Sequence, residues 1–144
     1  MERDIEIFEL LEAKEEHLHS IQQLLLQLSS RPHEFTLAHL CSLVNSENSH
    51  LFVATSNNKI CGMLTLATYL APTGRKWWVE DVVVDESMRG CSIGRRLLRF
   101  AVEFAGEIGG TVMLTSRPSR VAANALYRSS GFELKETNMY KMEL

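Results

Sequence analysis

The segment from Arg89 to Gly94 combines glycines with an arginine at the point where a predicted strand gives way to a predicted helix. Glycine lets the backbone approach a ligand closely, and the free N–H groups at a helix start attract anions. Arg95 and Arg96 follow in the first helical turn, where positive side chains oppose the helix dipole. A ligand that carries phosphate explains their presence better than an ordinary strand–turn–helix does, although the glycines also fit that simpler interpretation.

Two common phosphate-binding patterns do not occur at this segment. The sequence has no G-x-x-x-x-G-K-[ST] loop, and G-x-G-x-x-G cannot be aligned with residues 89–94. These absences disfavour a kinase-like or dinucleotide-binding enzyme. The net charge of −3 disfavours a nucleic-acid binder, because such proteins normally present a basic face.

Hydrophobic periodicity predicts the elements that position this segment. Apolar residues recur at helical spacing in some stretches, and β-branched or alternating apolar residues fill the others. Without internal repeats or linkers, residues 1–144 are expected to form one α/β layered domain. The expected strands are 5–11, 51–55, 59–70, 77–84, 111–115, 132–134 and 139–142, and the expected helices are 15–28, 36–44, 93–105 and 119–130.

Residues 79–99 resemble the acetyl-coenzyme A (acetyl-CoA) signature of the GNAT superfamily of N-acetyltransferases, an R/Q-x-x-G-x-G/A loop between a strand and a helix. Arg89, Ser92 and Gly94 occupy the three signature positions. Glycine is usual at the middle position, so Ser92 is a departure from the pattern. Because serine is small and a good helix cap, we expect the loop to form.

A second stretch, residues 119–132, resembles the family pattern A-x-x-L-Y-x-x-x-G-F. Two motifs in the family's order are more specific than either alone, and the resemblance covers roughly the C-terminal two-thirds of the chain. It implies the GNAT fold, a mixed, mostly antiparallel central sheet of six to seven strands flanked by about four helices. The matching residues are Ala123, Leu126, Tyr127, Gly131 and Phe132.

The resemblance implies acetyl-CoA as cosubstrate, no metal, and acetyl transfer to a primary amine by direct attack in a ternary complex. Backbone N–H groups of Val82–Val84 are expected to bind the cosubstrate, helped by a bulge that frees them from the sheet. Asn124 either bonds the pantetheine arm or faces solvent, and Arg120 stands where many relatives have an asparagine that contacts the cofactor. The expected contact residues are Val82, Val83, Val84, Arg89, Gly90, Cys91, Ser92, Ile93, Gly94, Arg95, Asn124 and Tyr127.

Two side chains are candidates for proton transfer. Tyr127 aligns with the tyrosine that protonates the leaving thiolate in many family members, and its alternative role is that of a buried aromatic. Glu80 is the candidate base, and its alternative role is a plain salt bridge. Strand alternation places Glu80 and Asp81 on opposite faces, so at most one of them faces the cleft.

The acceptor stays open between a small amine or amino acid and a peptide N-terminus or lysine. The alternative function is a non-catalytic coenzyme A-binding sensor or regulatory module on the same fold. The charged N-terminal segment has no signal-peptide core, and three widely spaced cysteines suit a reducing compartment, so we expect a cytoplasmic protein without membrane contact. Because relatives are commonly dimers, a homodimer is also among the expectations.

Overall fold

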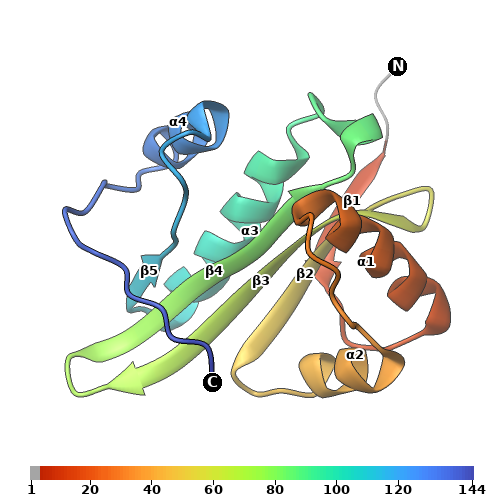
Figure 1. The fold of residues 1–144 in the computed structure, drawn as a ribbon, viewed down its shortest axis with the longest axis horizontal. Coiled ribbons are helices and arrows are strands. Elements are labelled where there is room, and N and C mark those ends of the chain that lie inside the picture. Colours follow the sequence, from red (N-terminus) through yellow and green to blue (C-terminus); the bar gives the residue numbers. More distant parts are fainter. Residues whose placement is uncertain (1–3) are drawn as a thin grey trace.

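The structure, a computed structural model, describes residues 4–144. A sheet with the strand order β1-β2-β3-β4-β5 forms its centre (Figure 1). The first four strands pair antiparallel, whereas β5 runs parallel to β4. The sheet is therefore mixed and mostly antiparallel, as expected. Its strands are β1 Ile5–Glu9, β2 Ser49–Ser56, β3 Lys59–Ala71, β4 Gly74–Val84 and β5 Thr111–Met113.

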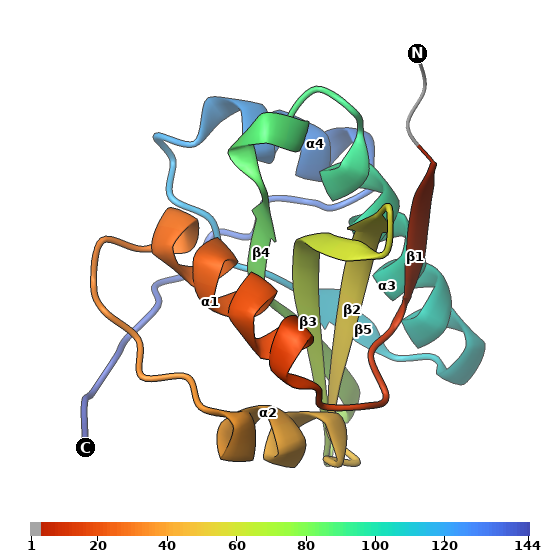
Figure 2. The same ribbon diagram turned by 90° about the vertical axis from the view of Figure 1, so that its right-hand side faces the viewer.

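Helices cover both faces of this sheet (Figure 2). α1 and α2 cover one face, and α3 covers the other together with α4. Strand residues alternate between the two cores: Leu51 and Val53 join the core beneath α1 and α2, and Phe52 joins the core beneath α3. None of the helices within residues 4–144 has the length and apolar character that a membrane crossing requires. The helices are α1 Glu15–Leu28, α2 Leu37–Val44, α3 Ile93–Ile108 and α4 Val121–Ser129.

The elements with strong local patterns form as predicted. α1 has the predicted bounds, and the Thr36 hydroxyl caps α2 by accepting a hydrogen bond from the His39 N–H at 3.2 Å. The hairpin of β2 and β3 turns at Asn57 and Asn58, whose φ angles of 53° and 63° suit a tight turn. Periodicity and turn chemistry are therefore sufficient to place these elements.

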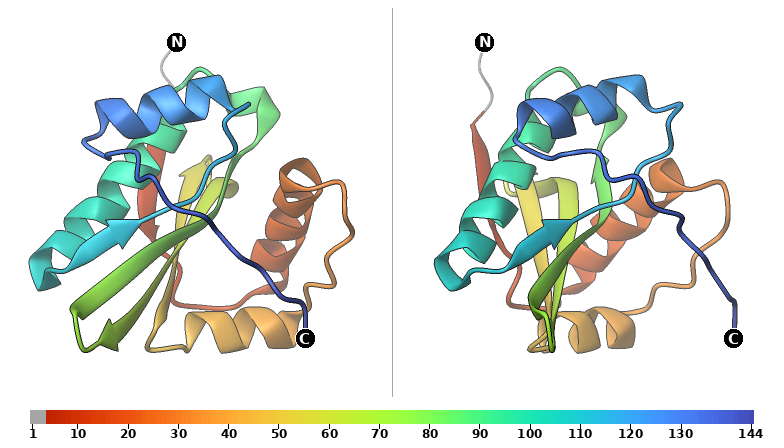
Figure 3. Two further views of the ribbon diagram at one scale, coloured as in Figure 1. Left: turned by 60° about the vertical axis from the view of Figure 1, so that its left-hand side comes forward. Right: turned by 90° about the vertical axis from the view of Figure 1, so that its left-hand side faces the viewer.

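The two predicted closing strands are wrong, because residues 132–144 contain no strand. Figure 3 shows this segment running as irregular chain from α4 past β5. Leu134 and Met142 are each 83% exposed, so the short apolar pattern there is not satisfied by burial. A short apolar run forms a strand only where an edge pairs with it, and within residues 4–144 the sheet has five strands instead of six to seven.

β4 and β5 are neighbours over only three residues each. Their pairing runs from Lys76 opposite Thr111 to Trp78 opposite Met113, and then the strands separate. Gly110 permits the close approach at the start of β5, since a Cβ there would lie 2.5 Å from the Arg75 carbonyl oxygen. The separation leaves the edge of β4 beyond Trp78 uncovered by β5.

A bulge interrupts the pairing of β4 with β3. Met63 lies opposite Val83 and Thr65 lies opposite Glu80, so β4 holds one more residue than β3 in this interval. Asp81 adopts a φ angle of 50° within the bulge. The bulge and the separated β5 fall on the same part of β4, which makes its backbone accessible from the β5 side.

Candidate active site

A cleft of about 1050 Å³ lies over the uncovered edge of β4. Its walls come from the last turn of α1, the loop after β4, the loop before α4, and α4 itself. The lining residues are Gln27, Leu28, Ser29, Ser30, Val82, Val83, Val84, Arg89, Gly94, Thr115, Ser116, Arg117, Ser119, Arg120, Ala123, Leu126 and Tyr127.

The backbone of β4 presents hydrogen-bond donors to this cleft. The Asp85 N–H donates to the Cys61 carbonyl of β3 at 2.8 Å. Because successive residues of an antiparallel strand direct their N–H groups to opposite edges, the N–H groups of Val82 and Val84 point away from β3, toward the uncovered edge. The arrangement leaves two backbone donors directed toward the cleft, and their binding of a carbonyl oxygen stays a prediction.

The end of α4 explains the spacing of the motif around Tyr127. Gly131, with a φ angle of 96°, follows the helix, and the Phe132 N–H donates to the Tyr127 carbonyl at 3.0 Å. The Gly131 N–H donates to the Arg128 carbonyl at 3.1 Å, which completes a Schellman motif. The rings of Tyr127 and Phe132 pack edge to face, with their centroids 6.2 Å apart. Glycine and phenylalanine in this motif therefore fix the helix end and the tyrosine ring together.

Tyr127 itself is 9% exposed and belongs to the core beneath α3. Its hydroxyl makes no hydrogen bond with any residue in the described range 4–144. Because Tyr127 lines the cleft and its hydroxyl has no partner in that range, the hydroxyl is available to a ligand bound in the cleft.

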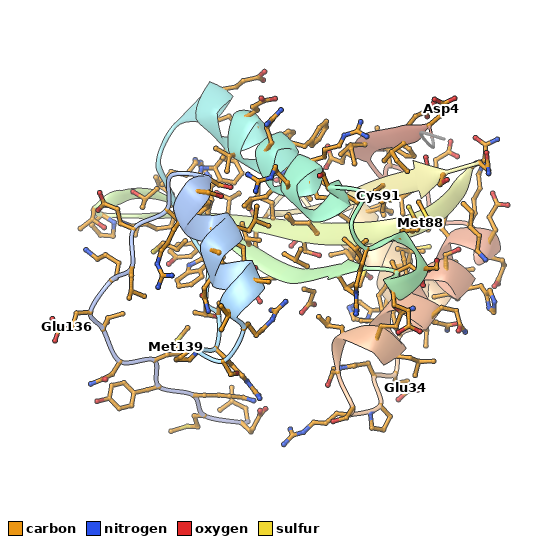
Figure 4. The ribbon with its side chains drawn as sticks, turned by 90° about the horizontal axis from the view of Figure 1, so that it is seen from above. Asp4, Glu34, Met88, Cys91, Glu136 and Met139 are labelled. Carbon is orange, nitrogen blue, oxygen red and sulfur yellow. The ribbon has the colours of Figure 1, made fainter. Side chains whose placement is uncertain are left out.

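The loop between β4 and α3 begins with a short 3-10 turn, Glu86–Met88. Asp85 caps this turn by accepting from the Ser87 N–H at 3.3 Å. Hydrogen bonds from the Ser87 hydroxyl and from Gln27 lower the pKa of Asp85. Figure 4 shows Met88 and Cys91 in this loop at the start of α3.

Ser92 is the N-cap residue of α3, but the expectation that it acts as a side-chain cap is wrong. Its hydroxyl makes no capping hydrogen bond, and its φ of 60° and ψ of 23° lie in the left-handed region. Glycine adopts this conformation without the steric cost that a Cβ brings, which explains the usual glycine at this signature position. The loop nevertheless forms around Ser92.

The structure brings half of the expected cosubstrate contacts to the cleft: Val82, Val83, Val84, Arg89, Gly94 and Tyr127. Gly90, Cys91, Ser92 and Arg95 are exposed in the same loop and first helical turn without lining the cleft, and Ile93 is buried in the core. Asn124 does not line the cleft either. Its side-chain amide donates to the carbonyls of Arg117 at 2.9 Å and Arg120 at 2.8 Å, so it orders the loop before α4.

Glu80 is exposed and does not line the cleft. Partial burial of its carboxyl group raises the pKa of Glu80, and the negative charge of Asp81 raises it further. The bulge adds a residue at Asp81 and interrupts simple alternation along β4, and neither Glu80 nor Asp81 lines the cleft. Val79 and Val82, three positions apart, consequently both contact the core beneath α3.

Sequence reasoning missed the α1 wall of the cleft and most of the loop before α4. The hydroxyl of Ser116 is buried and has no hydrogen-bond partner, the one such side-chain atom found within residues 4–144. The only sequence signal for this wall was the polar run from Ser116 to Arg120 between a predicted strand and helix. No group of three or more His, Cys, Asp or Glu side chains that could hold a metal occurs in the described part of the chain.

Comparison with known proteins identifies the family. The model described as "Acetyltransferase (GNAT) family" matches residues 8–132. The chain is 36% identical over 88 residues to the N-alpha-acetyltransferase RimI of Mycobacterium tuberculosis (strain ATCC 25618 / H37Rv), a match that covers 61% of this chain and 54% of RimI. The chain thus spans about half the length of this curated relative and 24% of an uncharacterised Mycobacterium leprae protein, ML0378.

Solved structures agree with this match. An acetyltransferase-family protein from Agrobacterium tumefaciens str. C58 superposes with a TM-score of 0.82 at 27% identity, over 96% of this chain and 99% of that chain. The aminoglycoside N-acetyltransferase AAC(6')-Iy, solved in complex with CoA, shares the fold with a TM-score of 0.76 at 14% identity, over 98% of this chain and 95% of that chain. The chain belongs to the GNAT family of acetyltransferases.

Proposed function

We propose that this protein transfers the acetyl group of acetyl-CoA to a primary amine. The observation that carries the proposal is the position of Tyr127, whose unpartnered hydroxyl belongs to the same cleft as the uncovered N–H groups of β4. An acid and a set of carbonyl-directed donors in one cleft are what cleavage of a thioester requires.

The residues of the cleft fit acetyl-CoA. Arg89 and the loop up to Gly94 would hold its phosphates, since Arg89 lines the cleft and makes no ion pair within residues 4–144. Along the pantetheine arm, the N–H groups of Val82 and Val84 would donate to the acetyl carbonyl oxygen and stabilise the negative charge that develops there.

The transfer needs two proton movements. The amine nitrogen forms a bond to the acetyl carbon while the carbon–sulfur bond breaks, so one proton leaves the nitrogen and one reaches the sulfur. Tyr127 would supply the proton to the thiolate, whose conjugate thiol has a pKa of about 8.5. Glu80 would accept the amine proton through water, because its raised pKa moves it toward the range of an effective base although its side chain stands outside the cleft lining.

A non-catalytic CoA-binding module is the second candidate. The position of Glu80 outside the cleft lining favours it, because a binding module requires no base. The two functions share the phosphate-binding loop and differ only in whether an acceptor consumes the acetyl group.

The test is acceptor-dependent release of the CoA thiol from acetyl-CoA, with the acetylated product identified by mass spectrometry. The acceptors are single amino acids, short peptides with free N-termini, lysine peptides, polyamines and aminoglycosides. These classes include the acceptors that the names of RimI and AAC(6')-Iy state for those proteins. Release with an acetylated product supports the proposal, whereas measured CoA binding without release from any acceptor supports the binding module.

A further inference from the structure

Among residues 4–144, the charged side chains that line the cleft are all positive. Arg89, Arg117 and Arg120 line it, and no aspartate or glutamate in this range does. None of the three arginines takes part in an ion pair with a residue in the described range 4–144. This distribution is opposite in sign to the net charge of −3 of the whole chain. The cleft is therefore arranged to receive negative charge.

The arginines lie near the two opposite ends of α4. The Arg95 guanidinium, in the first turn of α3, donates to the Ser129 hydroxyl at the last turn of α4, at 3.4 Å. The phosphate-binding loop thus lies near the C-terminal end of α4. Arg120 is the N-cap residue at the other end, and nine helical residues separate the two ends by roughly 13 Å. The phosphates that Arg89 would hold therefore leave Arg117 and Arg120 for a different anion.

Arg120 shares a helix face with the proposed acid. Arg120, Ala123 and Tyr127 stand at positions i, i+3 and i+7, and all three line the cleft. The axial separation of Arg120 from Tyr127 is roughly 10 Å. An anion held by Arg120 would consequently lie at the reacting end of the cleft.

Hydrogen bonds within the protein order the loop that carries Arg117 and Arg120. The Asn124 amide donates to the carbonyls of both Arg117 and Arg120, and the Arg120 N–H donates to the Arg117 carbonyl at 3.0 Å. The buried, unpartnered hydroxyl of Ser116 adjoins Arg117 and lines the same cleft. A buried hydroxyl without a partner destabilises the protein, and an anionic oxygen in the cleft would accept a hydrogen bond from it.

We propose that Arg117, Arg120 and Ser116 form a carboxylate subsite for the acceptor, so that the substrate is a primary amine that also bears a carboxylate, as an amino acid does. Guanidinium groups bind carboxylates through paired hydrogen bonds, which would fix the amine relative to Tyr127. This inference rests on the proposed acetyl transfer. It also predicts that polycationic acceptors bind poorly, because no carboxylate in the described part of the chain lines the cleft.

The test compares each of the twenty amino acids with its carboxamide as acceptor, on the wild type, Arg117→Gln and Arg120→Gln. Arg128→Gln is the matched control, since Arg128 is exposed on α4 and does not line the cleft. We expect the best amino acid to outperform its amide on the wild type. Either cleft substitution should raise the KM for that amino acid at least tenfold, about 1.4 kcal/mol, with the KM for acetyl-CoA changed less than about twofold. Amide kinetics and Arg128→Gln should match the wild type.

Equal kcat/KM of the wild type for acids and amides would overturn the subsite. A rise in Arg117→Gln and Arg120→Gln that is confined to the KM for acetyl-CoA would overturn it as well. If no acceptor is acetylated, calorimetric binding of the same acids and amides to the CoA-saturated protein separates the two proposals. Carboxylate-dependent binding that Arg120→Gln abolishes would support the subsite while the proposed activity fails. Acids and amides that bind equally, or not at all, would overturn the subsite as well.

Discussion

The side chain of Gln27 donates a hydrogen bond from Nε2 to Oδ1 of Asp85 at 2.7 Å. Its other amide atom, Oε1, accepts from the Glu86 N–H at 2.9 Å. One amide thus joins the last turn of α1 to the start of the loop that leads to Arg89. Because Gln27 also lines the cleft, this link sets the position of the α1 wall relative to the proposed phosphate-binding loop.

Replacing Gln27 tests this link. Gln27→Ala should lower the free energy of unfolding by about 1–2 kcal/mol, through the loss of two hydrogen bonds, and weaken CoA binding several-fold. Gln23→Ala, at an exposed position of the same helix, is the control and should match the wild type. Unfolding in urea and calorimetric CoA titration measure the two effects. Equal CoA affinity in both variants would contradict the positioning role.

The pH dependence of the Gln27 variant follows from Asp85. Hydrogen bonds from Ser87 and Gln27 lower the pKa of Asp85 below its ordinary value of 3.8. A carboxyl group whose pKa is lower in the folded protein than in the unfolded protein stabilises the fold at pH values above its unfolded pKa. This stabilisation is lost as the pH falls through the folded pKa. The stability difference between wild type and Gln27→Ala should therefore be full at neutral pH and shrink below a pH of about 4. A stability difference between the two proteins that does not change with pH would contradict the contribution of Gln27 to the lowered pKa of Asp85.

Tyr127→Phe separates catalysis from folding. The Tyr127 hydroxyl has no partner in residues 4–144, so its removal should leave the free energy of unfolding within about 0.5 kcal/mol of the wild type. If the hydroxyl protonates the thiolate, kcat should fall at least roughly tenfold, about 1.4 kcal/mol of barrier. Steady-state thiol release and urea unfolding provide the measurements. An unchanged kcat would keep the enzyme and reject Tyr127 as the acid.

Glu80→Gln should stabilise the protein at neutral pH. Partial burial, and then Asp81, raise the pKa of Glu80 above its ordinary value of 4.5. A carboxyl group whose pKa is higher in the folded protein than in the unfolded protein stabilises the fold at pH values below its unfolded pKa. This stabilisation is lost as the pH rises through the folded pKa. The variant should therefore unfold at higher urea than the wild type at pH of about 7 and match it near a pH of about 3.5.

The control for this comparison is Glu107→Gln, at an exposed carboxylate of α3. It should change the urea midpoint equally little at both pH values. The same Glu80 variant should lower kcat if Glu80 is the base. A lower stability of Glu80→Gln at neutral pH would show that its carboxylate has a favourable partner instead.

Ser92→Gly should strengthen the phosphate-binding loop. Ser92 holds a φ angle of 60° without a capping hydrogen bond, so its Cβ brings a steric cost and no compensating bond. Relief of the left-handed conformation should raise the free energy of unfolding by about 1 kcal/mol, with CoA affinity retained or improved. Ser92→Val should shift both quantities in the opposite direction. A destabilised glycine variant would indicate that the Ser92 side chain contributes a contact.

The elements predicted from sequence were those that local patterns determine. The spacing of Leu18, Ile21 and Leu24 defines α1, and all three are buried in the structure. The motif around Tyr127 indicated a helix end at Gly131 because the Schellman bonds join residues that are close in sequence. The bulge at Asp81 overrode strand alternation, which periodicity alone does not reveal.

The parts that sequence reasoning missed depend on contacts between distant residues. Gln27 meets Asp85 across 58 positions, and nothing in the pattern of α1 distinguishes it from Gln22 or Gln23. The predicted strand at 139–142 contains Met139, Tyr140 and Met142 but pairs with no strand edge, so its apolar residues alone did not determine a strand. The positive lining of the cleft likewise appears only when the fold places Arg89 and Arg120 along the same cleft.

The measurement that tests the central claim most directly is calorimetric titration of CoA into the wild type, Arg89→Ala and Arg99→Ala. Arg99 is an exposed arginine of α3 that faces the groove beside β1 instead of the cleft. The cleft as described predicts one CoA per chain, binding weakened at least tenfold by Arg89→Ala, about 1.4 kcal/mol, and unchanged by Arg99→Ala. No CoA binding by the wild type, or equal weakening by both substitutions, would contradict it.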